Sequence, residues 1–239
     1  MKTETEFLIR IVKEAEIISR KNYEVRQKDD KGDLITSLDI EIEKYLISQI
    51  NENYPEFIVV SEEFNSDAVI ADNCFIIDPI DGTINFANGL PIWGIQIACR
   101  KDGETAACVI DLPDLKEFYY ADETGAFLND KRIRIKEVPV KNAIFSVMGR
   151  NAIAGVEKMI GHTRNYRNYG AACSAYAFMA CGRIHGVSFT SDNPWDYEPG
   201  MFLCKMAGAE TKNIKGFHAA AMNREFLDLL EKETGRRII

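Results

Sequence analysis

The stretch "FIIDPIDGTINFANG" (residues 75–89) places an apolar run directly before two carboxylates on a tight turn. The run Phe75–Ile77 is typical of a buried strand, and Asp78 follows at the point where this strand should end. In α/β sheets, ligand-binding groups commonly lie at the carboxyl ends of strands. Asp81 comes three residues later, close enough to share one cation with Asp78. The stretch therefore predicts a metal-binding turn or, as the simpler alternative, a polar Asp-Gly turn.

The residues that follow Asp81 suit an anion. Gly82 allows the backbone to turn where a side chain would obstruct it. Thr83 is placed to cap the short segment "INFANG" (84–89), and a helix N-terminus presents free N–H groups that favour anions. We therefore expect two carboxylates, a hydroxyl and a phosphate-binding backbone in one loop.

Other acidic segments could contribute to the same site. Glu62 and Glu63 end the strand predicted from "VVSEEF", and Asp196 falls in the first turn of a helix that begins near "NPWDYEPG". Asp39, in "TSLD", completes a capping box at the start of another helix. Taken singly, Glu62 and Glu63 would begin a solvated loop and Asp196 would interact with the helix dipole. Asp39 would only cap its helix.

Together, the carboxylates favour a hard cation. Glu62, Asp78, Asp81 and Asp196 are oxygen ligands of the kind that Mg²⁺ prefers, and no cluster of histidines or cysteines favours zinc. The three histidines are scattered without ligand spacing, so we expect structural or surface roles for them. Two or three divalent ions would reverse the negative charge of the site and attract a phosphate dianion.

The composition excludes several classes of protein. The 239 residues, 46% of them hydrophobic, can build one large domain or two small ones, and the net charge of −8 argues against binding nucleic acid or an anionic membrane. Six cysteines without a C-x-x-C pair are expected to be free thiols in a reducing cytosol. The N-terminus lacks a signal-peptide pattern, and no apolar run approaches the ~20 residues of a membrane span. We therefore expect a cytoplasmic protein.

Hydrophobic periodicity divides the chain into two halves. In the first half it predicts helices at 6–20 and from Thr36, and strands at 57–61, 74–78, 94–100, 104–110, 117–121 and 132–137. In the second half it predicts strands at 143–149, 184–189 and within 216–223, and helices at 154–162, 170–182, from Trp195 and at 223–235. This order predicts an N-terminal α+β domain (1–138) with an antiparallel sheet and most of the metal ligands. An α/β domain (139–239) would carry Asp196.

Five motifs follow one another over residues 33–200. They are "DLITSLD" (33–39), "SEE" (61–63), "DPIDGTINF" (78–86), "RNYGAACSAY" (167–176) and "WDYEPG" (195–200). In content and order they resemble the inositol monophosphatase family, which are lithium-sensitive, magnesium-dependent phosphatases. The resemblance implies a layered α-β-α-β-α sandwich of the inositol monophosphatase and fructose-1,6-bisphosphatase type.

The resemblance also implies a role for each matching residue. Two to three Mg²⁺ ions would be held by Glu62, Asp78, the Ile80 carbonyl, Asp81 and Asp196. An attacking water would be activated by Thr83, Asp39 and Glu62, without a phosphoenzyme. The substrate would contact Asp81, Gly82, Thr83, Gly170, Ala171, Ala172 and Asp196. The site would be supported from behind by Glu63 and Trp195.

Three features depart from the family pattern: Phe189, the interval from Glu62 to Asp78, and a short tail after Trp195. Inositol phosphatases usually carry an acidic residue where this chain has Phe189, and an apolar ring cannot accept a hydrogen bond from a sugar hydroxyl. Phe189 therefore either favours a substrate that stacks, such as a nucleotide base, or is simply a core residue. The interval from Glu62 to Asp78 is short, so the loop between them is trimmed. The Arg- and Tyr-rich segment 164–169 is either an exposed strand or subunit contact, or a second phosphate or base site.

The sequence thus predicts Mg²⁺-dependent hydrolysis of a small phosphorylated metabolite, inositol 1-phosphate or a sugar phosphate. Alternatives are a 3′(2′),5′-bisphosphate nucleotide and fructose 1,6-bisphosphate. A hypothesis from another class is a regulatory protein that keeps the fold without turnover. The resemblance also favours a homodimer.

Overall fold

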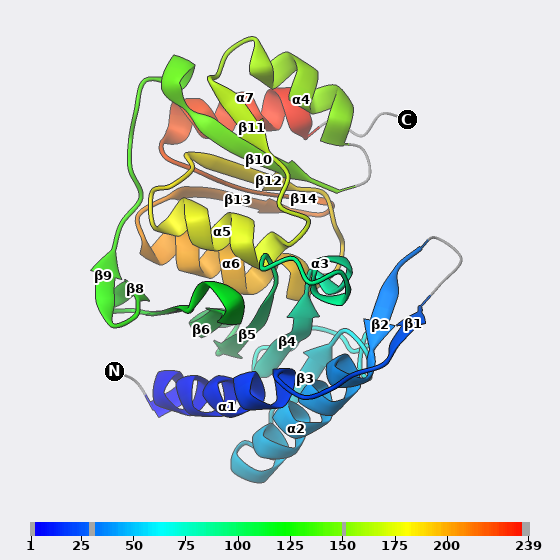
Figure 1. Cartoon of the computed structure of the whole chain (residues 1–239). Coiled ribbons are helices and arrows are strands. Elements are labelled where there is room, and N and C mark those ends of the chain that lie inside the picture. Colours follow the sequence, from blue (N-terminus) through cyan, green and yellow to red (C-terminus); the bar gives the residue numbers. More distant parts are fainter. Residues whose placement is uncertain (1–2, 29–31, 150–151, 236–239) are drawn as a thin grey trace.

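Secondary structure forms five layers in the computed structural model of the chain, which describes residues 3–28, 32–149 and 152–235. A helix pair, a seven-stranded sheet, a second helix pair, a five-stranded sheet and a third helix pair follow one another (Figure 1). This arrangement confirms the predicted α-β-α-β-α sandwich.

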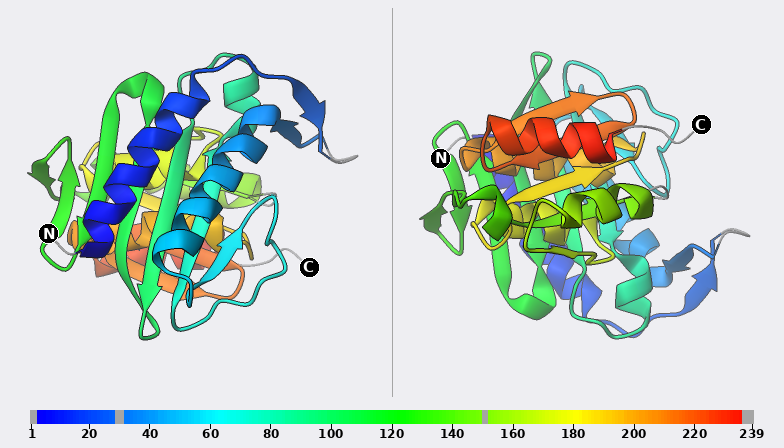
Figure 2. Two further views of the ribbon diagram at one scale, coloured as in Figure 1. Left: turned by 90° about the horizontal axis from the view of Figure 1, so that it is seen from below. Right: turned by 90° about the horizontal axis from the view of Figure 1, so that it is seen from above.

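The first helix pair lies across one face of the larger sheet. α1 (Thr3–Ser19) and α2 (Ser37–Asn53) pack side by side on this face (Figure 2, left). Both helices bury an apolar stripe at helical spacing, which fixes the position of α2 beside the sheet. α2 begins with the predicted capping box, in which the Asp39 carboxylate accepts a hydrogen bond from the Thr36 N–H at 2.8 Å.

The larger sheet has the strand order β3-β4-β5-β6-β7-β8-β9. Its strands are β3 (Ile58–Ser61), β4 (Cys74–Asp81), β5 (Gly94–Lys101), β6 (Glu104–Leu112), β7 (Glu117–Asp122), β8 (Gly125–Leu128) and β9 (Lys131–Ile133). β3 and β4 run parallel, and the other neighbours are antiparallel. β4 is buried at every residue because helices cover both faces of the sheet. The antiparallel pairing from β4 to β9 confirms the antiparallel sheet predicted for the first half of the chain.

The central layer consists of α5 (Ala172–Ala180) and α6 (Pro194–Met206). Every residue of α5 is buried, because a sheet lies on either side of this layer (Figure 1). The two helices approach closely at Gly200, where a Cβ atom would lie 2.3 Å from the ring of Tyr176. The absence of a side chain at Gly200 therefore allows α5 and α6 to pack closely within this layer.

The smaller sheet has the strand order β11-β10-β12-β14-β13. Its strands are β10 (Ile144–Met148), β11 (Asn165–Arg167), β12 (Gly186–Phe189), β13 (Glu210–Ile214) and β14 (Phe217–Ala221). α4 (Ala152–Ile160) and α7 (Arg224–Thr234) cover its outer face (Figure 2, right). The chain crosses from the first sheet to the second between Ile133 and Ile144, and the predicted domain division near residue 138 stays a prediction.

Several short elements differ from the prediction. The strand expected at 132–137 ends at Ile133, because the chain leaves the sheet and the Ile135 N–H donates to the Ala207 carbonyl at 3.1 Å. The hairpin of β1 (Val25–Gln27) and β2 (Leu34–Thr36), together with β8 and β13, was not predicted. Each of these strands has three to five residues, which is too short for a clear alternation of apolar and polar side chains.

The cysteines and the hydrophobicity of the helices can also be compared with the predictions from the sequence. All six cysteines lie in the described ranges and are unpaired, five of them buried. None of the helices in these ranges is long and apolar enough to cross a membrane.

Candidate active site

β4 carries Asp78, Ile80 and Asp81 into the candidate site. Residues three apart on a regular strand point to opposite faces of a sheet. Here the register against β5 shifts: Asp78 lies opposite Gln96, whereas Asp81 lies opposite Gly94. The extra residue on β4 is a bulge, and such a bulge allows both carboxylates to face one region.

Asp78 is the most deeply buried of the candidate ligands. Its Oδ1 atom has no hydrogen-bond partner in the described part of the chain. Burial raises the pKa of Asp78 well above its usual range, and the nearby carboxylates of Glu62, Asp81 and Asp196 raise it further. Four carboxylates that the sequence places far apart are therefore brought within repulsive range. A buried carboxylate oxygen without a donor among like charges suits a hard cation.

Asp81 lies against the N-terminus of α5. Its carboxylate accepts hydrogen bonds from the main-chain N–H groups of Ala172 and Cys173. Burial raises the pKa of Asp81, and these hydrogen bonds oppose the effect. Gly82 has φ +88°, and a Cβ atom there would lie 2.8 Å from Ala171 Cβ. The turn thus requires glycine, and the structure brings Ala171 and Ala172 to it. The expected role of both alanines in substrate binding stays a prediction.

Gly170 lies beside the same turn, where it contacts Asn85. Asn85 was not among the residues predicted for the site. A Cβ atom on Gly170 would lie 3.1 Å from the amide of Asn85. Asn85 Nδ2 donates to the carbonyl oxygens of Ile92 at 2.6 Å and Tyr169 at 2.8 Å. Asn85 therefore fastens the segment before α5 to the segment after the carboxylate turn.

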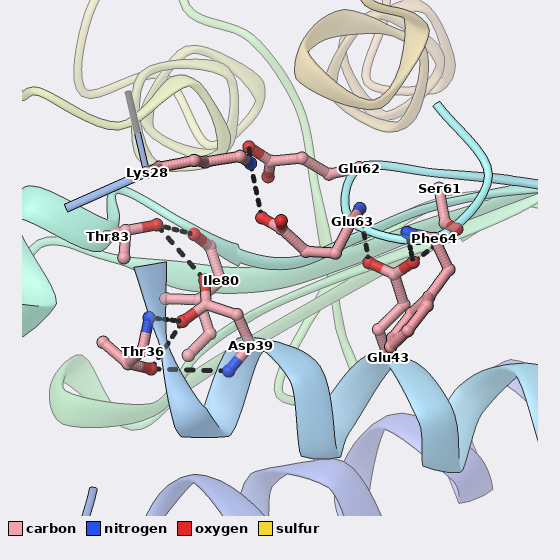
Figure 3. Close-up of polar contacts among 10 residues, drawn as sticks. All are labelled: Lys28, Thr36, Asp39, Glu43, Ser61, Glu62, Glu63, Phe64, Ile80 and Thr83. Carbon is pink, nitrogen blue, oxygen red and sulfur yellow. Dashed lines mark hydrogen bonds and ion pairs between the residues drawn. The ribbon is translucent and has the colours of Figure 1, made fainter. Parts of the chain in front are cut away.

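Thr83 and Asp39 meet although 44 positions separate them. Thr83 Oγ1 lies 2.9 Å from the Ile80 carbonyl oxygen and 3.3 Å from Asp39 Oδ1 (Figure 3). Burial raises the pKa of Asp39 to about 6 against the hydrogen bonds from Thr36. The expected capping role of Thr83 is wrong: Gly82 is the N-cap of α3 (Thr83–Ala87), and Thr83 is its first residue.

Glu62 and Glu63 both pair with Lys28, which the sequence did not single out. Lys28 follows β1, and its Nζ lies 2.8 Å from Glu62 Oε1 and 2.5 Å from Glu63 Oε1 (Figure 3). Burial raises the pKa of Glu63 to about 7, and the Lys28 hydrogen bond opposes this shift. Within residues 3–28, 32–149 and 152–235, no three His, Cys, Asp or Glu side chains are arranged to hold a metal ion. To bind a metal ion, Glu62 would have to give up its ion pair with Lys28. The predicted set of metal ligands therefore stays a prediction.

Asp196 enters the site from α6. Its Oδ2 atom accepts a hydrogen bond from Ser191 Oγ at 2.7 Å. Burial raises its pKa to about 7, and Asp81 and Glu62 add to the shift. Trp195, the preceding residue, is buried in the hydrophobic core, where it anchors the first turn of α6.

Glu43 is a buried carboxylate that sequence reasoning missed. It projects from α2 and accepts hydrogen bonds from Ser61 Oγ at 2.5 Å, the Glu63 N–H at 2.9 Å and the Phe64 N–H at 2.7 Å (Figure 3). It therefore fixes the turn on which Glu62 lies. Its position one helical turn after Asp39 is the only signal in the sequence that could have identified it.

We expect Glu43→Ala to lower the free energy of unfolding by about 2 kcal/mol or more, because one buried and two partly buried donors would lose their acceptor. Chemical unfolding monitored by circular dichroism measures this change. Glu52→Ala, an exposed change on the same helix, is the matched control and should cost less than about 0.5 kcal/mol. Equal effects of the two changes would contradict the assigned role of Glu43.

The segment 164–169 lies at the edge of the smaller sheet. β11 is exposed at all three residues and pairs in parallel with β10. This confirms the expected exposed strand, and a role in binding stays a prediction.

A comparison with known proteins identifies the family of the chain. The model of the inositol monophosphatase family matches residues 4–234 of this chain. The chain belongs to this family. The family assignment confirms the resemblance that the five motifs predicted.

Individual relatives cover most of the chain. A Thermotoga maritima protein named fructose-1,6-bisphosphatase/inositol-1-monophosphatase is 33% identical over 85% of this chain and 80% of its own. A Vibrio cholerae protein named Nus factor SuhB is 31% identical over 83% of this chain and 79% of its own. The solved structure of a Thermotoga maritima IMPase matches with a TM-score of 0.85 and 27% identity, over 95% of this chain and 94% of that one.

Proposed function

We propose that this member of the inositol monophosphatase family is a Mg²⁺-dependent phosphatase of a small phosphomonoester. The observation that carries the proposal is the buried, unpartnered Asp78 Oδ1 among three further carboxylates, beside the Thr83–Asp39 pair. Mutual repulsion of these groups is relieved by divalent cations, and oxygen ligands select Mg²⁺ over softer metals.

Different residues of the site would bind the metal ions and the phosphate group. Glu62, Asp78, the Ile80 carbonyl, Asp81 and Asp196 would hold two or three ions. When bound, Mg²⁺ would neutralise the charge that develops on the transferred phosphoryl group and its leaving oxygen. The main-chain N–H groups of Gly82 and Thr83 would hold phosphate oxygens.

Thr83 and Asp39 would handle the proton of the attacking water. Thr83 has one hydroxyl hydrogen and two acceptors within reach, the Ile80 carbonyl and Asp39. With the Ile80 carbonyl turned to a cation, the hydrogen would go to Asp39, and a lone pair of Thr83 Oγ1 could accept a hydrogen bond from water. Asp39, with a pKa near 6, is ionised at neutral pH and can take the proton that Thr83 passes on.

Phosphate release from a substrate panel tests the proposal. The panel comprises inositol 1-phosphate, fructose 1,6-bisphosphate and adenosine 3′,5′-bisphosphate, each measured in Mg²⁺ and in EDTA. Release that requires Mg²⁺ and favours one substrate by about 100-fold in kcat/KM would support the proposal and identify the substrate class. No release from any substrate, with Mg²⁺ binding established by calorimetry, would overturn it for this panel.

Phe189 favours nucleotide phosphates as the alternative substrate class. It is the last residue of β12, seven positions before Asp196 (196 − 189 = 7), and is half-buried against the core. We expect Phe189→Glu to raise the preference for inositol 1-phosphate over adenosine 3′,5′-bisphosphate by about 10-fold or more, since a carboxylate can accept hydrogen bonds from ring hydroxyls. The ratio of kcat/KM values measures the preference, with Phe189→Leu as the control. An unchanged ratio in Phe189→Glu would show that Phe189 belongs only to the core.

The relatives named Nus factor SuhB favour a second candidate function, a regulatory protein that keeps the fold. A regulatory role would not require the carboxylate cluster to catalyse phosphate release. A cellular role that survives Asp81→Asn would support it over the phosphatase.

A further inference from the structure

Asp196 is held by the loop between β12 and α6. Ser191 Oγ accepts a hydrogen bond from the Asn193 N–H at 3.0 Å, so its own hydrogen is free to donate to Asp196 Oδ2 at 2.7 Å. This donation turns the Asp196 carboxylate in one direction. The Asn193 side chain also forms a hydrogen bond with Asp196. The rotation of Asp196 therefore depends on where the main chain places Ser191 and Asn193.

His218 fixes the main chain at Ser191. It lies on β14, is 2% exposed, and its Nε2 atom is 2.7 Å from the Ser191 carbonyl oxygen. Its Nδ1 atom is 2.7 Å from the amide oxygen of Asn213, Oδ1, on β13. Its ring stacks on Tyr197 of α6 with centroids 3.5 Å apart and planes 5° apart. The ring is therefore held through both nitrogens and one face.

We propose that His218 is a positioning residue that acts through Ser191 to orient the Asp196 carboxylate toward a metal ion. The inference rests on the proposed function, because it takes Asp196 as a metal ligand. A histidine is suited to this role because a ring N–H can reach a carbonyl from a neighbouring strand while the ring packs in the core.

The contacts also assign the tautomer of His218. The Ser191 carbonyl can only accept, so Nε2 carries a hydrogen. Burial lowers the pKa of His218 below its usual value, against the smaller opposing effects of Ser191, Asp192 and Glu198, so the ring is neutral at pH 7. Nδ1 must then accept a hydrogen bond, which requires Asn213 to present its amide nitrogen rather than its oxygen. With its amide turned so that the nitrogen replaces Oδ1 at this contact, Asn213 favours the tautomer that holds Ser191.

Three variants test the proposal through metal affinity measured without substrate. We expect His218→Phe and Ser191→Ala to weaken Mg²⁺ binding in calorimetry by about 10-fold, the usual effect of removing a group that orients a ligand. The KM for substrate at saturating Mg²⁺ should change less than about 3-fold. His218→Gln keeps an amide N–H and should restore the affinity to within about 3-fold of wild type.

His185 supplies the matched control, since it is also buried and accepts a main-chain hydrogen bond, from Ile144 at 3.0 Å. His185→Phe should leave Mg²⁺ affinity unchanged. Equal Mg²⁺ affinity in His218→Phe and wild type would overturn the proposal. If His218→Phe does not fold, nitrogen-15 NMR of wild type decides instead: Nε2–H supports the proposal, and a neutral Nδ1–H ring overturns it.

Failure of this inference can be told apart from failure of the proposed function. Weaker Mg²⁺ binding in His218→Phe together with no phosphate release by wild type would support the inference and count against the phosphatase. An active wild type with unchanged Mg²⁺ affinity in His218→Phe would overturn the inference alone.

Discussion

Asp81→Asn is expected to lower kcat/KM for phosphate release by about 100-fold or more. The change replaces a charged oxygen ligand by a neutral amide, and metal-ion stabilisation of a developing charge contributes several kcal/mol to a transition state. The amide oxygen of asparagine can still accept hydrogen bonds from the α5 N-terminus, so the turn should keep its shape. Steady-state phosphate release over a range of Mg²⁺ concentrations measures the loss.

Two controls separate the chemistry from folding. Asp67→Asn, an exposed change in the loop before β4, should leave the rate unchanged. The thermal midpoint of Asp81→Asn in EDTA should be no lower than that of wild type, because the change removes one buried charge from a repelling group. Activity within about tenfold of wild type would show that Asp81 does not bind the metal.

The central elements of the fold could be predicted because their patterns are local. The Phe75–Ile77 run identified β4, and the Thr36–Asp39 capping box identified the start of α2. Small apolar residues identified α5 as a buried helix. In each case the deciding residues lie within one turn or one strand of each other, so spacing alone carries the information.

The features that were missed depend on contacts between distant segments. The bulge that turns Asp78 and Asp81 to one region appears only when β4 is paired with β5. Lys28 reaches Glu62 across 34 positions. The short strand before it, β1, is exposed at every residue, so no alternation of buried and exposed side chains marks Lys28 as functional. His218 was expected to have an ordinary role because its link to Asp196 passes through a loop 27 positions earlier in the chain. A single sequence contains no spacing rule for such contacts.

Removal of divalent metal is expected to make the stability of the protein fall steeply as the pH rises from about 4 to 7. Asp196 has an ordinary pKa of 3.8, and burial raises it to about 7 in the folded chain. The folded state thus binds this proton more tightly than the unfolded state, so stability is highest at low pH and is lost as pH rises toward the folded pKa. For one group this shift corresponds to on the order of 4 kcal/mol. Asp78 and Asp81 shift in the same direction, but their mutual repulsion is shared, so the effects do not add.

Saturating Mg²⁺ should remove most of this pH dependence, because bound cations favour the ionised carboxylates. Stabilisation by the metal should therefore be large at pH 8 and small at pH 5. Thermal unfolding at both pH values, in EDTA and in Mg²⁺, measures the difference. Asp196→Asn should flatten the profile in EDTA and leave the profile in Mg²⁺ nearly unchanged.

Asp111 provides the matched control for this experiment. It is a buried carboxyl on β6, its Oδ2 atom lacks a hydrogen-bond partner among the described residues, and burial raises its pKa to about 7 as well. The charged side chains that affect its pKa are Glu16 and Lys13 on α1 and Arg20 just after it, so Asp111 lies apart from the carboxylate cluster. Asp111→Asn should therefore flatten the pH profile by the same amount with and without Mg²⁺. If Asp196→Asn behaved in the same way as Asp111→Asn, the cluster around Asp78 would be an ordinary set of buried acids, and the metal site would be refuted independently of any substrate.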